Sequence, residues 1–366
     1  MTLKEKIDKN RLLNVLLISF SYMLFKLIRI IKKRSNNNLE TIVIIVFHKL
    51  GDSVFVLPAL KKIIEEHSKN KIYIFCHKDT QNIYEKVIAE VKYVIIEKSN
   101  FLFDGRFASK EARRLLKSIN PSTIVDLTGT IVSASLVFNS NANHILGINE
   151  PYFKAIYDDY HAIRKSPHLI DIYLDAIDNF SLLKDRNYES YPIRNRKNGD
   201  IFIQPFAGWP AKEWNFIKFL ELYKRLSIEN ECTFIVPKYS IKSDVYNAMI
   251  NDDIRIIETE SISHFINLLD KCKLFISNDS GPLQIASLFG VATFSIYGPT
   301  NPKFHMPLGS LHRFVQKKIK CSPIDTKYCF TFGGRYCPHY DCLALLSTDE
   351  IYNKVREILI DITINS

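Results

Sequence analysis

The sequence lacks three features: a long uncharged apolar run, a signal-peptide cleavage site and a cysteine pair of the form Cys-x-x-Cys. Its most apolar stretch, residues 12–31, is interrupted by Lys26 and Arg29, so it is not a clean membrane span. No small-residue cleavage site follows, which argues against a cleaved leader peptide. Charged residues make up 24% and hydrophobic residues 46% of the 366-residue chain, so we expect two folded domains rather than a mostly disordered protein.

The positive charge is concentrated near the N-terminus. Of the formal net charge of +10, residues 1–34 carry +7, with nine basic residues against the acids Glu5 and Asp8. A nucleic-acid-binding protein spreads its basic residues over a groove or face, so we expect no nucleic-acid partner. A localised basic segment suits an anionic membrane surface better. The nine basic residues are Lys4, Lys6, Lys9, Arg11, Lys26, Arg29, Lys32, Lys33 and Arg34.

Residues 12–31 have a helical but imperfectly amphipathic pattern. Polar and basic residues occupy one half of the helical wheel, and four apolar residues intrude on that half: Val15, Ile18, Tyr22 and Phe25. We predict that residues 1–38 form a basic helix and a polar linker, with the helix lying in the plane of a membrane surface. A helix packed on the protein's own core and a single membrane span are the alternatives.

The first domain is expected over residues 39–185. Its first strand, at 41–47, is an apolar and β-branched run typical of a central parallel strand. Further strands and helices alternate after it, which predicts a doubly wound α/β domain; the strands are expected at 72–76, 93–96 and 123–127, and helices at 53–66 and 108–119. Pro58 lies within the first helical pattern and predicts a kink or a late helix start.

A second doubly wound domain is expected over residues 186–345. Its strands are predicted at 200–205, 232–236, 254–257, 273–277 and 292–297, with helices between them. A last amphipathic helix at 348–359, within the segment 346–366, is expected to pack back across the domains.

Three turns that follow predicted strands contain candidate catalytic or ligand-binding residues. Gly51 and Asp52 follow the first strand, where Asp52 is either a general base toward a hydroxyl group or a helix cap. Lys212 lies near the start of a helix at 215–226, where an ammonium group can neutralise a diphosphate; a solvated lysine is the alternative. Asp279 and the residues after it open another helix, whose free N–H groups suit a phosphate.

Residues 277–302 resemble the donor-site motif of glycosyltransferase family 9, the lipopolysaccharide heptosyltransferases and their relatives. The matching residues are Asp279-Ser280-Gly281-Pro282 with Ala286, followed by Tyr297-Gly298-Pro299-Thr300 and Pro302. Lys49-Leu50-Gly51-Asp52 with Pro58, and the segment containing Lys212 and Trp214, are similar to two further family motifs. The resemblance covers about residues 41–360.

The resemblance implies a GT-B fold, in which two Rossmann-like domains face a cleft, and an inverting glycosyltransferase that needs neither metal nor cofactor. It implies Asp52 as the catalytic base, Lys212 as a ligand of the donor diphosphate, and donor contacts from Asp279, Ser280, Gly281, Gln284, Gly298 and Thr300. The expected donor is ADP-heptose, and the expected acceptor is lipid A–Kdo or a growing lipopolysaccharide core. The expected location is the inner face of the cytoplasmic membrane.

The acceptor side is less clearly marked. Lys49, Gly51, Thr128 and His168 are candidates, although a turn and helix cap near Thr128 and a structural histidine at 168 are the simpler interpretations. Two departures from the family affect the donor. Gln284 stands where the family often has histidine, and residues 237–240 lack the Gly-rich and acidic residues that contact the nucleoside.

Four cysteines lie within the last fifty residues: Cys321, Cys329, Cys337 and Cys342. Structural zinc is one interpretation, weakened by the spacing; disulfides and buried reduced thiols are the others. Two other functional classes also stay open. One is a nucleotide-sugar epimerase or another enzyme on a GT-B scaffold, and the other is a non-catalytic membrane-associated protein that binds nucleotide sugars.

Overall fold

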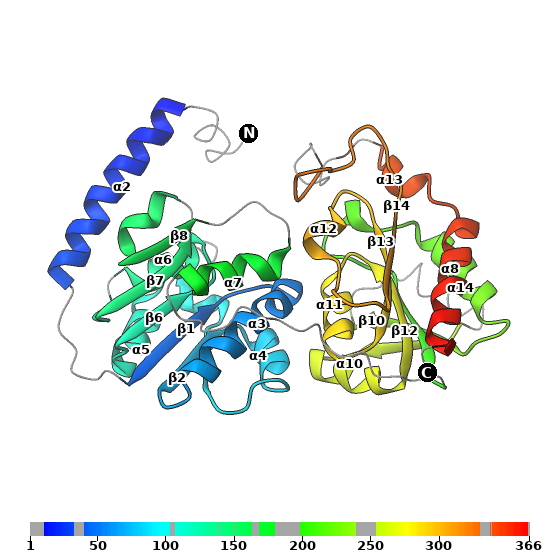
Figure 1. Cartoon of the computed structure of the whole chain (residues 1–366), viewed down its shortest axis with the longest axis horizontal. Coiled ribbons are helices and arrows are strands. Elements are labelled where there is room, and N and C mark those ends of the chain that lie inside the picture. Colours follow the sequence, from blue (N-terminus) through cyan, green and yellow to red (C-terminus); the bar gives the residue numbers. More distant parts are fainter. Residues whose placement is uncertain are drawn as a thin grey trace. The chain divides into compact units, whose positions relative to one another are not determined.

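The computed structural model describes residues 11–32, 40–102, 107–138, 140–149, 151–162, 168–179, 198–238, 254–329, 337 and 339–364. The predicted linker at 35–38 and the boundary between 185 and 186 lie outside these ranges. Two compact units are present (Figure 1). The N-terminal unit is Met1–His48, Phe55–Arg164 and Ile170–Asn187, and the C-terminal unit is Lys49–Val54, Lys165–Leu169 and Tyr188–Ser366.

The N-terminal unit contains a six-stranded, all-parallel sheet in the order β3-β2-β1-β6-β7-β8. Numbered along the chain, this is the 3-2-1-4-5-6 order of a Rossmann fold. All six residues of the central strand β1 are buried, because helices cover both faces of the sheet. The strands are β1 (Thr41–Val46), β2 (Lys71–Cys76), β3 (Lys92–Ile95), β6 (Thr123–Asp126), β7 (His144–Asn149) and β8 (Asp159–Ala162).

Helices α3 and α4 lie on one side of this sheet, and α5 and α6 on the other (Figure 1). Ser109 caps α5, its hydroxyl oxygen accepting a hydrogen bond from the Ala112 N–H. The elements between the strands are α3 (Leu50–Glu66), α4 (Lys78–Tyr84), α5 (Lys110–Ile119), α6 (Ile131–Val137), α7 (Leu169–Asn179), the 3₁₀ turns η1 (Lys98–Asn100) and η2 (Pro151–Ile156), and the hairpin β4 (Phe101–Leu102) with β5 (Phe107–Ala108).

Of the two alternatives predicted from Pro58, a kink or a late helix start, the late start is wrong. Helix α3 begins at Leu50, so Gly51 and Asp52 lie in its first turn and Pro58 lies inside it. The Ser53 N–H already donates to the Lys49 carbonyl at 2.9 Å. Pro58 removes one helical hydrogen bond, but the residues beside it are buried in the unit, and this tertiary packing keeps the helix continuous.

The C-terminal unit repeats the same topology, with strand order β11-β10-β9-β12-β13-β14, all parallel. Helices α8 and α14 lie on one side of the sheet, and α10 and α11 on the other (Figure 1). The strands are β9 (Asp200–Gln204), β10 (Cys232–Pro237), β11 (Ile256–Thr259), β12 (Cys272–Asn278), β13 (Ala292–Tyr297) and β14 (His312–Gln316).

The last helix contributes to the core of the C-terminal unit. Helix α14 packs against α8, β13 and β14, and buries Ile351, Val355, Ile358 and Ile362. The helices and 3₁₀ turns of this unit are η3 (Pro210–Lys212), α8 (Phe216–Leu226), α10 (Ile262–Leu268), η4 (Leu269–Lys271), α11 (Gly281–Leu288), α12 (Pro302–His305), α13 (Asp341–Ala344) and α14 (Thr348–Ile364).

The helix expected near the N-terminus is α2 (Arg11–Lys32), and it packs on η2 of the N-terminal unit. The Phe25 ring lies 6.4 Å from that of Phe138 and 6.2 Å from that of Phe153, measured between centroids. Arg29 is buried and donates to the Asp158 carboxylate. Within the described ranges, no helix combines the length and apolarity needed to cross a bilayer.

Candidate active site

The candidate site lies where the strand order of the C-terminal sheet reverses. Strands β9 and β12 are neighbours there, with Gln204 paired to Ser277 near their carboxyl ends. The chain leaves β9 into the loop that holds Lys212 and leaves β12 into the residues 279–281. Ligands of doubly wound folds bind at such a reversal, since the two loops diverge and leave an opening between them.

Lys212 and Asp279 meet at this position. The Lys212 Nζ lies 2.7 Å from an Asp279 carboxylate oxygen and 4.7 Å from the centroid of the Trp209 ring. Burial by itself would raise the pKa of Asp279, but the adjacent Lys212 ammonium outweighs it and holds the pKa below its usual value. Asp279 is therefore a buried carboxylate at neutral pH, and it is paired with a partly buried lysine from which it is separated by 67 residues in the sequence.

Asn278 fixes the loop that carries Lys212. Its side-chain amide donates to the Pro205 carbonyl at 2.6 Å and accepts from the Trp214 N–H at 3.0 Å. Asn215 caps the following helix α8, since its side chain accepts a hydrogen bond from the Ile217 N–H. Lys212 thus sits on a turn held at both ends. The sequence analysis did not single out Asn278, although its position at the end of a buried strand was a signal.

Ser280, rather than Asp279, caps helix α11. The Ser280 hydroxyl accepts from the Leu283 N–H, and Pro282 occupies the first turn, where its missing N–H costs nothing. Asp279 is thereby left to pair with Lys212. The predicted anion-favouring helix start is present, beside the buried lysine.

The turn containing Gly51 lies against the start of α11 within the C-terminal unit. A Cβ atom on Gly51 would lie 3.5 Å from the Gly281 Cα, and one on Gly281 would lie 3.1 Å from the Leu50 Cβ. The two glycines therefore allow their backbones to approach closely. Asp52, the next residue, is half-buried in the first turn of α3.

Two basic residues that the sequence analysis did not identify lie at the same site. Burial lowers the pKa of Lys327, and Lys212 lowers it further, while Asp52 and Asp279 oppose this shift. Lys327 is therefore close enough to both carboxylates to feel their charge. Burial lowers the pKa of His305 to about 4, so His305 is neutral at pH 7. Neither residue stands in a recognisable motif, which is why pattern reasoning missed them.

The remaining donor-side candidates are buried around this cluster. The Gln284 side chain donates to the His305 carbonyl at 2.7 Å, so its amide is engaged inside the unit. The buried Thr300 hydroxyl lies beside Asp279 and contributes to lowering the pKa of that carboxyl group. Gly298 is required by packing, because a Cβ atom there would lie 2.8 Å from Leu343.

The acceptor-side candidates are divided between the two units. The Thr128 hydroxyl oxygen accepts from the Phe47 N–H at 2.9 Å, next to strand β1 of the N-terminal unit. In the C-terminal unit, His168 is buried with its Nε2 2.9 Å from the Met306 carbonyl, and Lys49 is exposed. Both hydrogen bonds join a side chain to the backbone of another segment of the same unit, and the Thr128 side chain does not cap α6, whose N-cap residue is Thr130.

The seven cysteines are free thiols, and burial raises the pKa of the Cys342 thiol to about 11. Cys321 is exposed, and Cys329 and Cys337 are half-buried. Among the residues that the structure describes, no three His, Cys, Asp or Glu side chains are grouped so as to hold a metal ion.

Solved structures share this architecture. A glycosyl transferase family 9 protein from Veillonella parvula superposes with a TM-score of 0.73, at 15% identity, over 90% of this chain and 100% of that one. The ADP-heptose LPS heptosyltransferase II of E. coli gives 0.67, at 16% identity, over 88% and 99%. The E. coli heptosyltransferase WaaC with ADP-2-deoxy-2-fluoro heptose gives 0.65, at 15% identity, over 87% and 99%. The fold is therefore that of a GT-B glycosyltransferase.

Sequence comparison identifies the family. The sequence model of glycosyltransferase family 9 (heptosyltransferase) matches residues 111–331, more than half of the chain. The lipooligosaccharide heptosyltransferase 2 of Campylobacter jejuni is 23% identical over 324 residues, which is 84% of this chain and 96% of that protein. The chain belongs to glycosyltransferase family 9 and is a glycosyltransferase.

Proposed function

We propose that this protein transfers a heptose from ADP-heptose to the core of a lipopolysaccharide or lipooligosaccharide acceptor. The observation that carries the proposal is the buried Lys212–Asp279 pair at the strand ends of β9 and β12, with Lys327 and Asp52 within electrostatic range. We infer the two substrates from similar proteins. An E. coli structure contains ADP-2-deoxy-2-fluoro heptose, and the C. jejuni relative is named for lipooligosaccharide.

We assign the role of general base to Asp52. Its carboxylate takes the proton from the acceptor hydroxyl as that oxygen forms a bond to the anomeric carbon of the sugar. The bond from this carbon to the diphosphate breaks on the opposite face, so the anomeric configuration inverts and ADP leaves with the electron pair. Asp52 lies on the first turn of a helix beside Gly51, a position fixed by backbone packing against Gly281.

The departing diphosphate gains negative charge, and the basic residues of the site stabilise it. Lys212 and Lys327 supply two ammonium groups, and the start of α11 supplies the positive end of its helix dipole. Asp279 holds Lys212 in place before the donor binds. These groups neutralise the charge of the diphosphate, a task that a bound metal ion could otherwise perform. We therefore propose a metal-independent reaction.

The other predicted residues take supporting roles in this proposal. Thr300 offers a buried hydroxyl to the donor, and Gln284 orients the segment around His305 through the carbonyl that it binds. Lys49 and Gly51 are the neighbours of Asp52 in the chain, and we keep them, with Thr128 and His168, as candidates for acceptor contacts. An acceptor of this kind is amphiphilic, so we place the enzyme at the inner face of the cytoplasmic membrane.

The test is heptose transfer from ADP-heptose to heptose-deficient lipopolysaccharide in the presence of EDTA, with Asp52→Asn compared with wild type. Loss of the base is expected to lower kcat about 10²- to 10⁴-fold and to leave ADP affinity unchanged. Glu357→Gln, a change of the same kind at an exposed position of α14, is the matched control. Undiminished transfer by Asp52→Asn would show that Asp52 is not the general base.

Two further outcomes separate this proposal from its alternatives. Conversion of ADP-heptose without an acceptor would indicate an epimerase or hydrolase on the same scaffold. Tight ADP binding by a wild-type protein that transfers to no acceptor would indicate a non-catalytic nucleotide-sugar-binding protein.

A further inference from the structure

One side of helix α2 carries a continuous stripe of apolar side chains. The seven residues of the stripe are 43% to 73% exposed: Leu16, Phe20, Met23, Leu24, Leu27, Ile30 and Ile31. At about 100° per residue, their positions fall within an arc of about 120°. An arc of that width is the apolar face of an amphipathic helix, a face that normally packs against something.

The rest of the helix explains why the stripe points outward. Phe25 lies on the opposite side, where it packs against Phe138 and Phe153. Arg29 also faces the N-terminal unit, where its Nη2 donates to the Ala142 carbonyl at 2.8 Å and to the Asp158 carboxylate at 2.5 Å. Phe25 and Arg29 therefore fix the rotation of α2 about its axis, and the stripe is left facing away from the unit.

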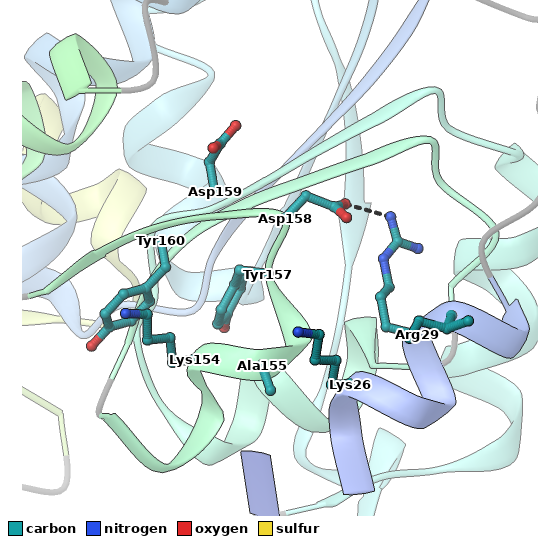
Figure 2. A pocket seen from close by; sticks show the side chains of 9 residues that line it. Lys26, Arg29, Lys154, Ala155, Tyr157, Asp158, Asp159 and Tyr160 are labelled. Atoms are coloured by element: carbon teal, nitrogen blue, oxygen red, sulfur yellow. Dashed lines mark hydrogen bonds and ion pairs between the residues drawn. The ribbon is translucent and has the colours of Figure 1, made fainter. Parts of the chain in front are cut away.

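Positive charge accompanies the stripe. Residues 1–34 carry +7, and the exposed Lys26 lies at the edge of the stripe. Figure 2 shows Lys26 and Lys154 on the walls of a hollow of about 470 Å³ between α2 and η2. The two carboxylates that line this hollow are engaged, Asp158 with Arg29 and Asp159 with His144 at 2.7 Å.

We propose that α2 docks this protein on an anionic bilayer, with the apolar stripe among the acyl chains and the basic residues at the level of the headgroup phosphates. Charge complementarity favours this occupant over a second copy of the chain. Pairing two stripes would bring two segments of +7 together, whereas an anionic membrane attracts both. The inference extends the proposed function, because a lipid-linked acceptor lies in a membrane, but the binding itself requires no sugar transfer.

The experiment is flotation of the full chain with vesicles of phosphatidylethanolamine and phosphatidylglycerol, compared with phosphatidylcholine alone. The wild type is expected to float with the anionic vesicles and to be released by added salt. Phe20→Glu combined with Leu27→Glu is expected to lower the partition coefficient at least about tenfold. Ile228→Glu combined with Ile364→Glu adds the same charge at positions that are 80% and 74% exposed, and this control is expected to float as the wild type does.

Three results would overturn the docking proposal. The first is a wild type that does not float, and the second is a stripe variant that floats as well as the wild type. The third is that, without lipid, light scattering gives the mass of a dimer for the wild type and of a monomer for the stripe variant. Thermal unfolding of each variant checks that the fold is intact, since the stripe is exposed. ADP affinity, measured on the same preparations, separates the two proposals. If the wild type binds ADP but does not float, only the docking proposal is contradicted. If it floats but transfers no sugar, only the proposed reaction is contradicted.

Discussion

The charge of Lys327, a partly buried residue, depends strongly on its neighbours. Burial disfavours its ammonium group and Lys212 repels it, whereas Asp52, Asp279 and the Tyr328 ring, whose centroid lies 5.4 Å from the Nζ, favour the charged form. A diphosphate placed between Lys212 and Lys327 would remove that imbalance. We therefore expect Lys327 to contribute to donor affinity as strongly as Lys212 does, although no motif marks it.

Replacement of Lys327 by methionine keeps the apolar length of the side chain and removes the charge. We expect Lys327→Met to weaken ADP binding about tenfold to a hundredfold, since hydrogen bonds from charged donors to phosphate are among the stronger ones. Isothermal titration calorimetry with ADP measures this directly. The control is Lys320→Met, which removes an exposed lysine from the same unit. Equal ADP affinity in both variants would place Lys327 outside the donor site.

Among the elements, α2 is joined to the N-terminal unit by polar contacts of Arg29. Arg29 joins the helix to the Ala142 carbonyl and to Asp158, which in turn accepts from the Ile145 N–H at 2.8 Å. Its Nε and Nη1 are buried without a hydrogen-bond partner among the described residues, so part of the gain is lost to desolvation.

Arg29→Met is expected to loosen α2 and to lower the free energy of unfolding of the N-terminal unit by about 2 to 3 kcal/mol, because Asp158 is left largely buried without its cation. Hydrogen exchange read out by mass spectrometry should show faster exchange throughout α2. Arg114→Met, at an exposed position of α5, should leave both quantities unchanged. Unchanged protection of α2 in Arg29→Met would show that Phe25 and the apolar contacts hold the helix by themselves.

For the whole molecule, three buried groups set the response of stability to mild acid. Burial lowers the pKa of His305 and of His312 to about 4, below the value of about 6.5 in an unfolded chain. Burial raises the pKa of Asp126 to about 6, against about 3.9 unfolded. Between pH 4 and 6, the unfolded chain therefore binds up to two more protons at the histidines and one fewer at Asp126.

Stability should consequently fall as the pH is lowered from about 6.5 toward 4.5, since proton binding favours the unfolded chain. Each histidine contributes a slope of at most about 1.4 kcal/mol per pH unit, and Asp126 opposes with a slope of the same size. His312→Gln keeps a polar group next to Thr293 and should reduce the dependence by the slope of one histidine. Urea unfolding between pH 4.5 and 7, followed by the fluorescence of Trp209 and Trp214 in the C-terminal unit, measures it. An equally steep dependence in His312→Gln would contradict the assignment.

Much of the fold follows from local sequence. Buried parallel strands are continuous apolar runs, so β1, β9, β12 and β13 were predicted within one or two residues of their ends. The strands β7, β8 and β14 were missed; β8 contains Asp159 and His161, and β14 contains His312 and Arg313, so neither is a continuous apolar run. Such strands form through pairing with a neighbour that lies elsewhere in the sequence, and this information is absent from a local window.

The same division holds for the site. The two doubly wound units and the strand ends that hold Asp52, Lys212 and Asp279 are predictable from the sequence, because strand ends and helix starts are local features. The pairing of Lys212 with Asp279, the presence of Lys327 and His305 beside them, and the outward orientation of the apolar stripe of α2 are visible only in the folded protein. These contacts join residues far apart in the chain, and their strength depends on burial, which exists only once the chain has folded.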